Sequence, residues 1–220
     1  MTSRSRDRVY DSLLMCGVAA SMVYTITDRI AAVAYPGYSS IAQAVSELFA
    51  IGAPTGPLVV SLFTLSSALV AAFALGVWSS FSGSRAMRAM ALMFLGGAVD
   101  SLVLWNFFPM HMRGSDPTFT DTMHLVLSIN PFMLASIALA TATIKGWFRL
   151  YSMGTILLML LLAVFAFSYA SAVVVNQPTP WLGVTERAAQ YGYELWQAVL
   201  AIILMGLRQS DAAINAKRCM

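Results

Sequence analysis

Charged residues are scarce in this sequence. Asp, Glu, Lys and Arg make up 10% of its 220 residues, whereas hydrophobic residues make up 59%. Soluble domains carry about a quarter charged residues, so the composition excludes an ordinary soluble domain. The formal charge of +3 does not indicate nucleic-acid binding, because the basic residues lie in short clusters between apolar runs, where they act as topology signals. We therefore expect a membrane protein with no nucleic-acid partner.

Cysteine and histidine are equally rare, with two residues of each. Cys16 falls early in the first apolar run and Cys219 at the far end of the sequence. They are too few and too poorly placed to build a disulfide framework or a cysteine metal site. His111 and His124 do not form a His-Glu-x-x-His zinc motif.

Apolar runs dominate the sequence instead. A helix that crosses a bilayer needs about 20 mostly apolar residues. We predict an all-α, polytopic six-helix transmembrane bundle that forms a single integral membrane domain over residues 1–220. The expected spans are 13–34, 58–78, 89–108, 121–143, 151–174 and 186–207.

The first run has an alternative interpretation. A basic flank before an apolar stretch also describes a cleavable signal peptide. The run is long for a signal core, and Asp28-Arg29 interrupts it, so we interpret it as a retained span.

Two further local features bear on the architecture. Residues 39–50 alternate polar and apolar side chains at helical spacing but are too short to cross a membrane, which predicts a short amphipathic helix on the outer face or over the bundle mouth. Asn130-Pro131 interrupts the fourth run and predicts a kink, because proline removes a backbone hydrogen bond.

The basic residues predict the orientation. Only Arg29, Arg113 and Arg187 fall on the side of the bundle that we assign to the outside, while ten fall on the other side. Positive residues mark the cytoplasmic side, so we expect a multi-pass protein of the cell membrane with both termini cytoplasmic. The ten are Arg4, Arg6, Arg8, Arg85, Arg88, Lys145, Arg149, Arg208, Lys217 and Arg218.

Acidic residues inside apolar helices suggest a functional site, because a carboxylate in the membrane is costly. Asp100 lies in the third run, and Glu194 lies at a similar expected depth in the sixth. We expect the two to meet in an outward-facing polar pocket and to act with His124 as candidate catalytic residues. The candidate ligand-binding residues around them are Ser46, Glu47, Glu186, Arg187, Gln190 and Trp105.

Several functions remain open for such a pocket. The leading one is binding or processing of a lipid or other amphiphile, with membrane lipids as partners. A second is a zinc-type hydrolase, in which His111, His124 and Asp121 would hold a divalent metal. Bis-histidine haem and proton or ion transport fit less well, because His111 lies in a loop and the carboxylates stop in the outer half.

A purely structural role is also open. In that case Asp28, Arg29, Glu186 and Arg187 form interfacial ion pairs, and Asp100 and Glu194 only hydrogen-bond between helices.

The segment from Tyr38 to Leu48, followed by Gly52-Ala53-Pro54, resembles the multi-pass prokaryotic family known as domain of unknown function 998. Phe108-Pro109, His124, the stretch from Gly183 to Arg187, and Trp196 also fit. The resemblance implies a six-helix membrane protein without an established activity. The stretch from Ser46 to Pro57 is more loosely similar to the Frag1/DRAM/Sfk1 proteins, which are associated with membrane-lipid remodelling, and this implies lipids rather than ions. Neither resemblance assigns catalytic residues.

Overall fold

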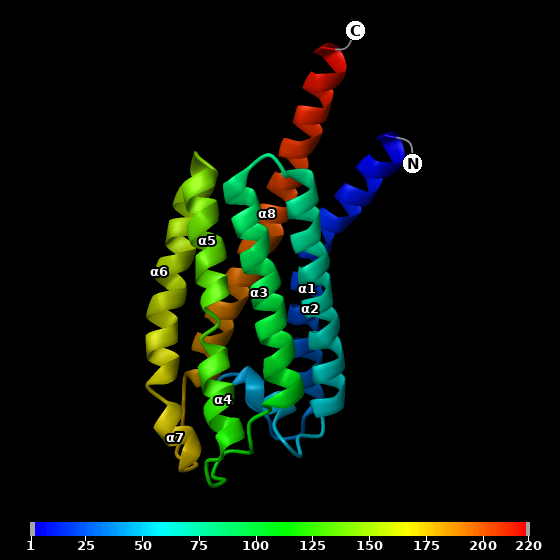
Figure 1. Ribbon diagram of the computed structural model, residues 1–220. Coiled ribbons are helices and arrows are strands. Elements are labelled where there is room, and N and C mark those ends of the chain that lie inside the picture. Colours follow the sequence, from blue (N-terminus) through cyan, green and yellow to red (C-terminus); the bar gives the residue numbers. More distant parts are fainter. Residues whose placement is uncertain (1–2, 219–220) are drawn as a thin grey trace.

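The computed structural model describes residues 3–218 as a bundle of long helices, with no strand among those residues (Figure 1). Both ends of the chain lie at one end of the bundle, which we call the terminal end. The opposite end, which we call the cap end, holds the long loops and two short helices. The long helices are α1 (Ser3–Ala34), α2 (Gly56–Ser80), α3 (Arg85–Phe107), α6 (Trp147–Phe167) and α8 (Leu182–Arg218), and the shorter ones are η1 (Val45–Phe49), α4 (Phe119–Ser128), α5 (Pro131–Thr143) and α7 (Ala170–Val174).

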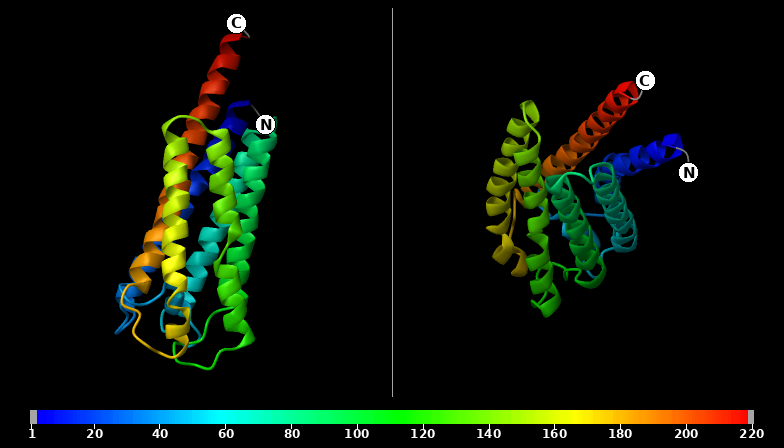
Figure 2. Two further views of the ribbon diagram at one scale, coloured as in Figure 1. Left: turned by 90° about the vertical axis from the view of Figure 1, so that its left-hand side faces the viewer. Right: turned by 45° about the horizontal axis from the view of Figure 1, so that its top comes forward.

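The helices are those of a multi-pass membrane protein. Among the residues that the structure describes, five segments are long and apolar enough to cross a membrane, namely Asp7–Ala34, Gly56–Ser80, Arg85–Phe107, Phe119–Thr143 and Trp147–Phe167. The sixth expected span lies in α8, which packs against α1 and α6 (Figure 2). It is not among those five, and its first half carries Glu186, Arg187 and Glu194.

The amphipathic helix expected at 39–50 is not formed. Residues 39–44 make turns, and only the five residues of η1 are helical. Side chains bond to nearby backbone groups: Gln43 accepts a hydrogen bond from the N–H of Ser39 at 2.8 Å, and Glu47 accepts one at 2.9 Å from the N–H of Ala44, which a helix over 39–50 would use internally. Such local bonds compete with helix formation. The apolar residues of η1 are buried in the bundle instead of lying along its face.

The expected kink at Asn130-Pro131 is confirmed. Helix α4 ends at Ser128 and α5 begins at Pro131, with Asn130 in the left-handed conformation at φ 35°. The fifth expected span is also interrupted, because α6 ends at Phe167 and α7 forms a separate short turn of helix. Both breaks lie next to the cavity described below.

Two apolar clusters hold the bundle together. The larger surrounds Trp196, whose indole N–H donates a hydrogen bond to the Ser152 hydroxyl at 2.9 Å. The smaller lies near the cap end and includes Phe49 and Phe63. Glycine permits close helix packing: a Cβ on Gly76 would lie 2.8 Å from the Cβ of Leu13. Close approach through small residues is typical of helices that associate in membranes.

Candidate functional site

A cavity of about 580 Å³ opens near the cap end, between the α4–α5 column, the α6–α7 segment and the start of α8. We call it the pocket. Apolar side chains of α5 and α6, including Met133, Leu134 and Met159, form its deeper wall. Polar side chains gather toward the cap end; among the candidate residues these are Ser46, His111, Asp121, His124, Glu186 and Gln190.

A buried ion pair lies beside the pocket and joins α8 to α1. The Arg187 guanidinium donates two hydrogen bonds to Asp28, at 3.0 Å to Oδ2 and 2.8 Å to Oδ1. The Asp28 side chain is fully buried and that of Arg187 is 6% exposed. A buried charge pair needs further hydrogen bonds to offset desolvation. Arg187 supplies them through Nη1, which donates to the carbonyl oxygens of Ser40 and Gln43 at 3.0 Å each.

Two tyrosines form further hydrogen bonds with this ion pair. Tyr191 donates its hydroxyl hydrogen to Asp28. Tyr38 accepts a hydrogen bond from Arg187 Nη2 at 2.5 Å and donates one to the carbonyl of Ala44 at 2.7 Å. Burial raises the pKa of the Tyr38 hydroxyl, so it remains a neutral donor. The group therefore fixes the 38–44 segment onto the start of α8.

Gly183 makes this contact sterically feasible. A Cβ at this position would lie 2.4 Å from the carbonyl oxygen of Gln43 and 2.5 Å from that of Ser40. The N–H of Val184 also donates to the carbonyl of Ile41 at 3.2 Å. A glycine here is required because the loop backbone passes directly against the first turn of α8.

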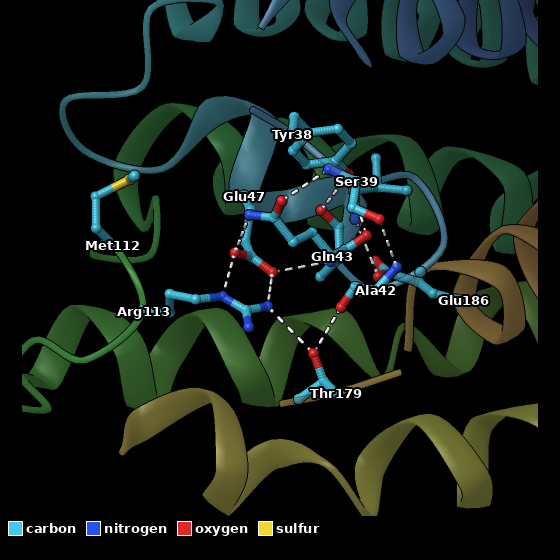
Figure 3. Close-up of polar contacts among 12 residues, drawn as sticks. Tyr38, Ser39, Ala42, Gln43, Glu47, Met112, Arg113, Thr179 and Glu186 are labelled. Atoms are coloured by element: carbon cyan, nitrogen blue, oxygen red, sulfur yellow. Dashed lines mark hydrogen bonds and ion pairs between the residues drawn. The ribbon is translucent and has the colours of Figure 1, made fainter. Parts of the chain in front are cut away.

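A second ion pair ties three loops of the cap end together (Figure 3). Arg113 donates to Glu47 through Nε at 2.8 Å and through Nη2 at 2.6 Å. Arg113 Nη2 also donates to the Thr179 hydroxyl at 3.3 Å, and this hydroxyl donates to the carbonyl of Ala42 at 2.6 Å. Hydrogen bonding to Glu47 raises the pKa of Arg113, so the pair stays ionic. We call these two ion pairs and the segments they join the cap.

The two histidines take separate partners. His111 lies 2.9 Å from Asp121 through Nδ1, and Asp121 also accepts hydrogen bonds from the N–H groups of His111 and Thr118. His124 is buried, and its Nδ1 lies 2.8 Å from the carbonyl oxygen of Phe108. Because that oxygen can only accept, Nδ1 carries the hydrogen and Nε2 is left as an acceptor.

The structure does not bring Asp100 and Glu194 together. Asp100 lines a separate hollow between α3 and the α4–α5 column, and its Oδ2 is buried without a hydrogen-bond partner. Glu194 accepts a hydrogen bond from Gln190 at 2.9 Å. Trp105 packs against Phe49 and Phe63. Neither Asp100, Glu194 nor Trp105 lines the pocket.

The metal ligands proposed from the sequence are not clustered. His111 and Asp121 are neighbours, but His124 turns Nδ1 to Phe108. Among the residues whose side chains the structure describes (5 and 7–210), no group of three or more His, Cys, Asp and Glu could hold a metal ion.

The purely structural interpretation expected ion pairs among Asp28, Arg29, Glu186 and Arg187, and one such pair is present at the cap. Arg187 does pair with Asp28, whereas Arg29 is exposed and Glu186 is absent from the five ion pairs found in the described part of the chain. Sequence reasoning did not identify Arg113 or Tyr38 as site residues. A signal for Arg113 did exist, since it is one of only three basic residues assigned to the outside.

A family model described as protein of unknown function (DUF998) matches residues 18–203. The match covers most of the chain, so the protein belongs to the DUF998 family, as the resemblance predicts. No curated protein and no solved structure matches the chain. None of these comparisons shows the expected similarity to the Frag1/DRAM/Sfk1 proteins.

Proposed function

We propose that this DUF998 member binds a lipid or another amphiphile in the pocket, with the alkyl chain against α5 and α6 and the headgroup toward the cap end. The observation that carries the proposal is the division of the pocket wall. Its deeper part is built from apolar residues such as Leu134, Met159 and Ala163, and polar residues lie toward one end. A cavity of about 580 Å³ is within the range of small-molecule sites, which combine an apolar lining with a few polar groups.

We also propose that the pocket faces outward. The basic turns at Arg85 and Arg88 and at Lys145 and Arg149 connect helices at the terminal end (Figure 1). Positive residues favour the cytoplasmic side, which puts the cap end on the opposite side of the membrane.

Binding is favoured over processing. Of the three candidate catalytic residues only His124 lines the pocket, and the described residues offer no metal-ligand cluster beside it. A zinc-type hydrolase would need a metal to activate water, so the geometry favours this alternative less.

A steric block tests the proposal. Ala163→Phe fills the pocket from α6, whereas Val164→Phe adds the same ring at a neighbouring side chain that is 74% exposed and does not line the pocket. We expect amphiphile that co-purifies with the wild type, measured by mass spectrometry, to be lost from Ala163→Phe and retained by Val164→Phe. Equal retention by the two variants would contradict the proposal.

A further inference from the structure

The charges around the polar end of the pocket are mostly already paired. Arg187 is held by Asp28 at 2.8 Å, Arg113 by Glu47 at 2.6 Å, and His111 by Asp121 at 2.9 Å. An anionic headgroup such as a phosphate is normally bound by arginine through several N–H groups. Arg113 does line the pocket, but Nε and Nη2 of its guanidinium are bonded to Glu47 and Thr179. The pocket therefore offers no arginine whose charge is uncompensated.

Glu186 differs from the three paired carboxylates Asp28, Glu47 and Asp121. It lines the pocket and accepts one hydrogen bond, from the backbone N–H of Val45 to Oε2 at 3.0 Å. The neighbouring Arg187 is turned to Asp28, and none of the ion pairs among the described side chains includes Glu186. Figure 3 shows Glu186 beyond Gln43 from Arg113. A half-buried carboxylate thus faces the cavity without a cationic partner.

Two neighbouring polar groups also offer acceptor atoms. Gln190 lines the pocket and donates one of its two amide N–H groups to Glu194 at 2.9 Å, which leaves its amide oxygen and its second N–H. His124 uses Nδ1 toward Phe108 and leaves Nε2 as an acceptor. A ligand group that donates hydrogen bonds and carries positive charge complements this set, whereas an anion would add repulsion beside Glu186.

We propose that the pocket selects amphiphiles with a cationic headgroup, an amine or ammonium, and that Glu186 is the counter-ion. This inference rests on the proposed function, because it names the ligand class of the same pocket. The Glu186 carboxylate would pair with the headgroup while the alkyl chain lies against α5 and α6. Complementary charge in a partly desolvated site gives specificity as well as affinity.

The test uses three probes with one chain length, dodecyltrimethylammonium, dodecyl phosphate and dodecyl maltoside. Each is titrated into purified full-length protein in digitonin, and displacement of a fluorescent alkyl probe is measured. We expect the wild type to bind the ammonium probe about tenfold or more tightly than the phosphate or the maltoside. Equal affinity for the three probes, or preference for the phosphate, would overturn the inference, and this comparison needs no variant.

Two variants locate the charge. Glu186→Gln keeps an oxygen for the Val45 N–H, and we expect it to lose about tenfold in affinity for the ammonium probe with unchanged affinity for the maltoside. Asp100→Asn removes a carboxylate outside the pocket and should bind all three probes like the wild type. If Glu186→Gln binds the ammonium probe as tightly as the wild type does, Glu186 is not the counter-ion. That result would leave the proposed amphiphile binding untouched. If Ala163→Phe fails to reduce binding of any probe, the proposed function itself fails.

Discussion

The two ends of α8 carry the same kinds of residue in different surroundings. Near the cap end, Arg187 pairs with a fully buried Asp28, and Gly183 lies directly against the loop backbone. Near the terminal end, Arg208 pairs with Asp7 and Asp11, whose side chains are 53% and 34% exposed, and a Cβ on Gly206 would meet nothing within 4 Å. Arg208 is itself only 10% exposed, so the two ends of α8 differ in the acidic partners, which are buried at the cap end and reach solvent at the terminal end. Burial of the partners, more than the type of residue, therefore decides how much an ion pair contributes to stability.

The largest expected effect comes from breaking the buried pair. Arg187→Met leaves the Asp28 carboxylate buried without its cation, which costs about 3–5 kcal/mol of unfolding free energy. Arg208→Met removes a largely buried arginine whose two partners reach solvent and can be hydrated without it, so we expect a smaller loss of about 1–2 kcal/mol. Denaturant unfolding in mixed micelles, followed by circular dichroism, measures both.

A double variant separates the cost of an unpaired buried charge from the loss of the ion pair itself. Asp28→Leu with Arg187→Met removes both charges, so we expect it to recover part of the lost stability. Recovery should be incomplete, because Tyr38, Tyr191 and the carbonyls of Ser40 and Gln43 lose their partners. Similar losses in Arg187→Met and Arg208→Met would remove the distinction between the two ends.

The glycines give a second, smaller contrast. Gly183→Ala places a methyl group within 2.5 Å of two carbonyl oxygens, so the loop must move, at a cost of about 1–3 kcal/mol. Gly206→Ala meets no neighbour and restricts the unfolded chain, so it should be neutral or stabilising by up to about 1 kcal/mol. The unfolding temperatures of Gly183→Ala and Gly206→Ala, each compared with the wild type, measure these two effects. A stable Gly183→Ala protein that retains ligand binding would show that the loop contact is dispensable.

The smallest difference that we expect between the two ends of α8 is in how salt changes the stability lost with each arginine. Ions screen exposed charges beyond about 10 Å at 0.1 M and affect buried pairs much less. The stability lost in Arg208→Met should therefore shrink by a few tenths of a kcal/mol from low to high salt, whereas the loss in Arg187→Met should stay constant. Unfolding of both variants at two salt concentrations measures the difference. The opposite dependence would mean that water reaches Arg187.

The carboxylates show how far residue-level reasoning reaches. Helical spacing correctly puts Glu186 and Gln190 near one another on one stripe, because the helical period is a local property. Estimated depth alone led to the expectation that Asp100 meets Glu194. Depth does not state the direction in which a side chain points, and Asp100 faces the hollow beside Leu127 and Phe132.

The 39–50 segment shows a different limit. Its apolar spacing is real, and Val45, Leu48 and Phe49 are buried as one apolar group. The side chains of Tyr38, Gln43 and Glu47 bond to nearby backbone groups and replace most of the helix with turns. Their partners in the cap, Arg187 and Arg113, come from distant parts of the chain. The spacing of apolar residues within 39–50 therefore could not predict that turns replace the helix.

Local properties of the chain were enough to predict an all-helical, multi-pass protein with a break at Asn130-Pro131. These properties follow from composition, hydropathy and proline chemistry, which act within one segment of chain. No local pattern predicts that Arg187 pairs with Asp28, 159 positions away, or that Arg113 pairs with Glu47, 66 positions away. Those pairings leave Glu186 without a cation at the pocket. Which charge meets which depends on how separate helices and loops pack, and that information lies in no single segment.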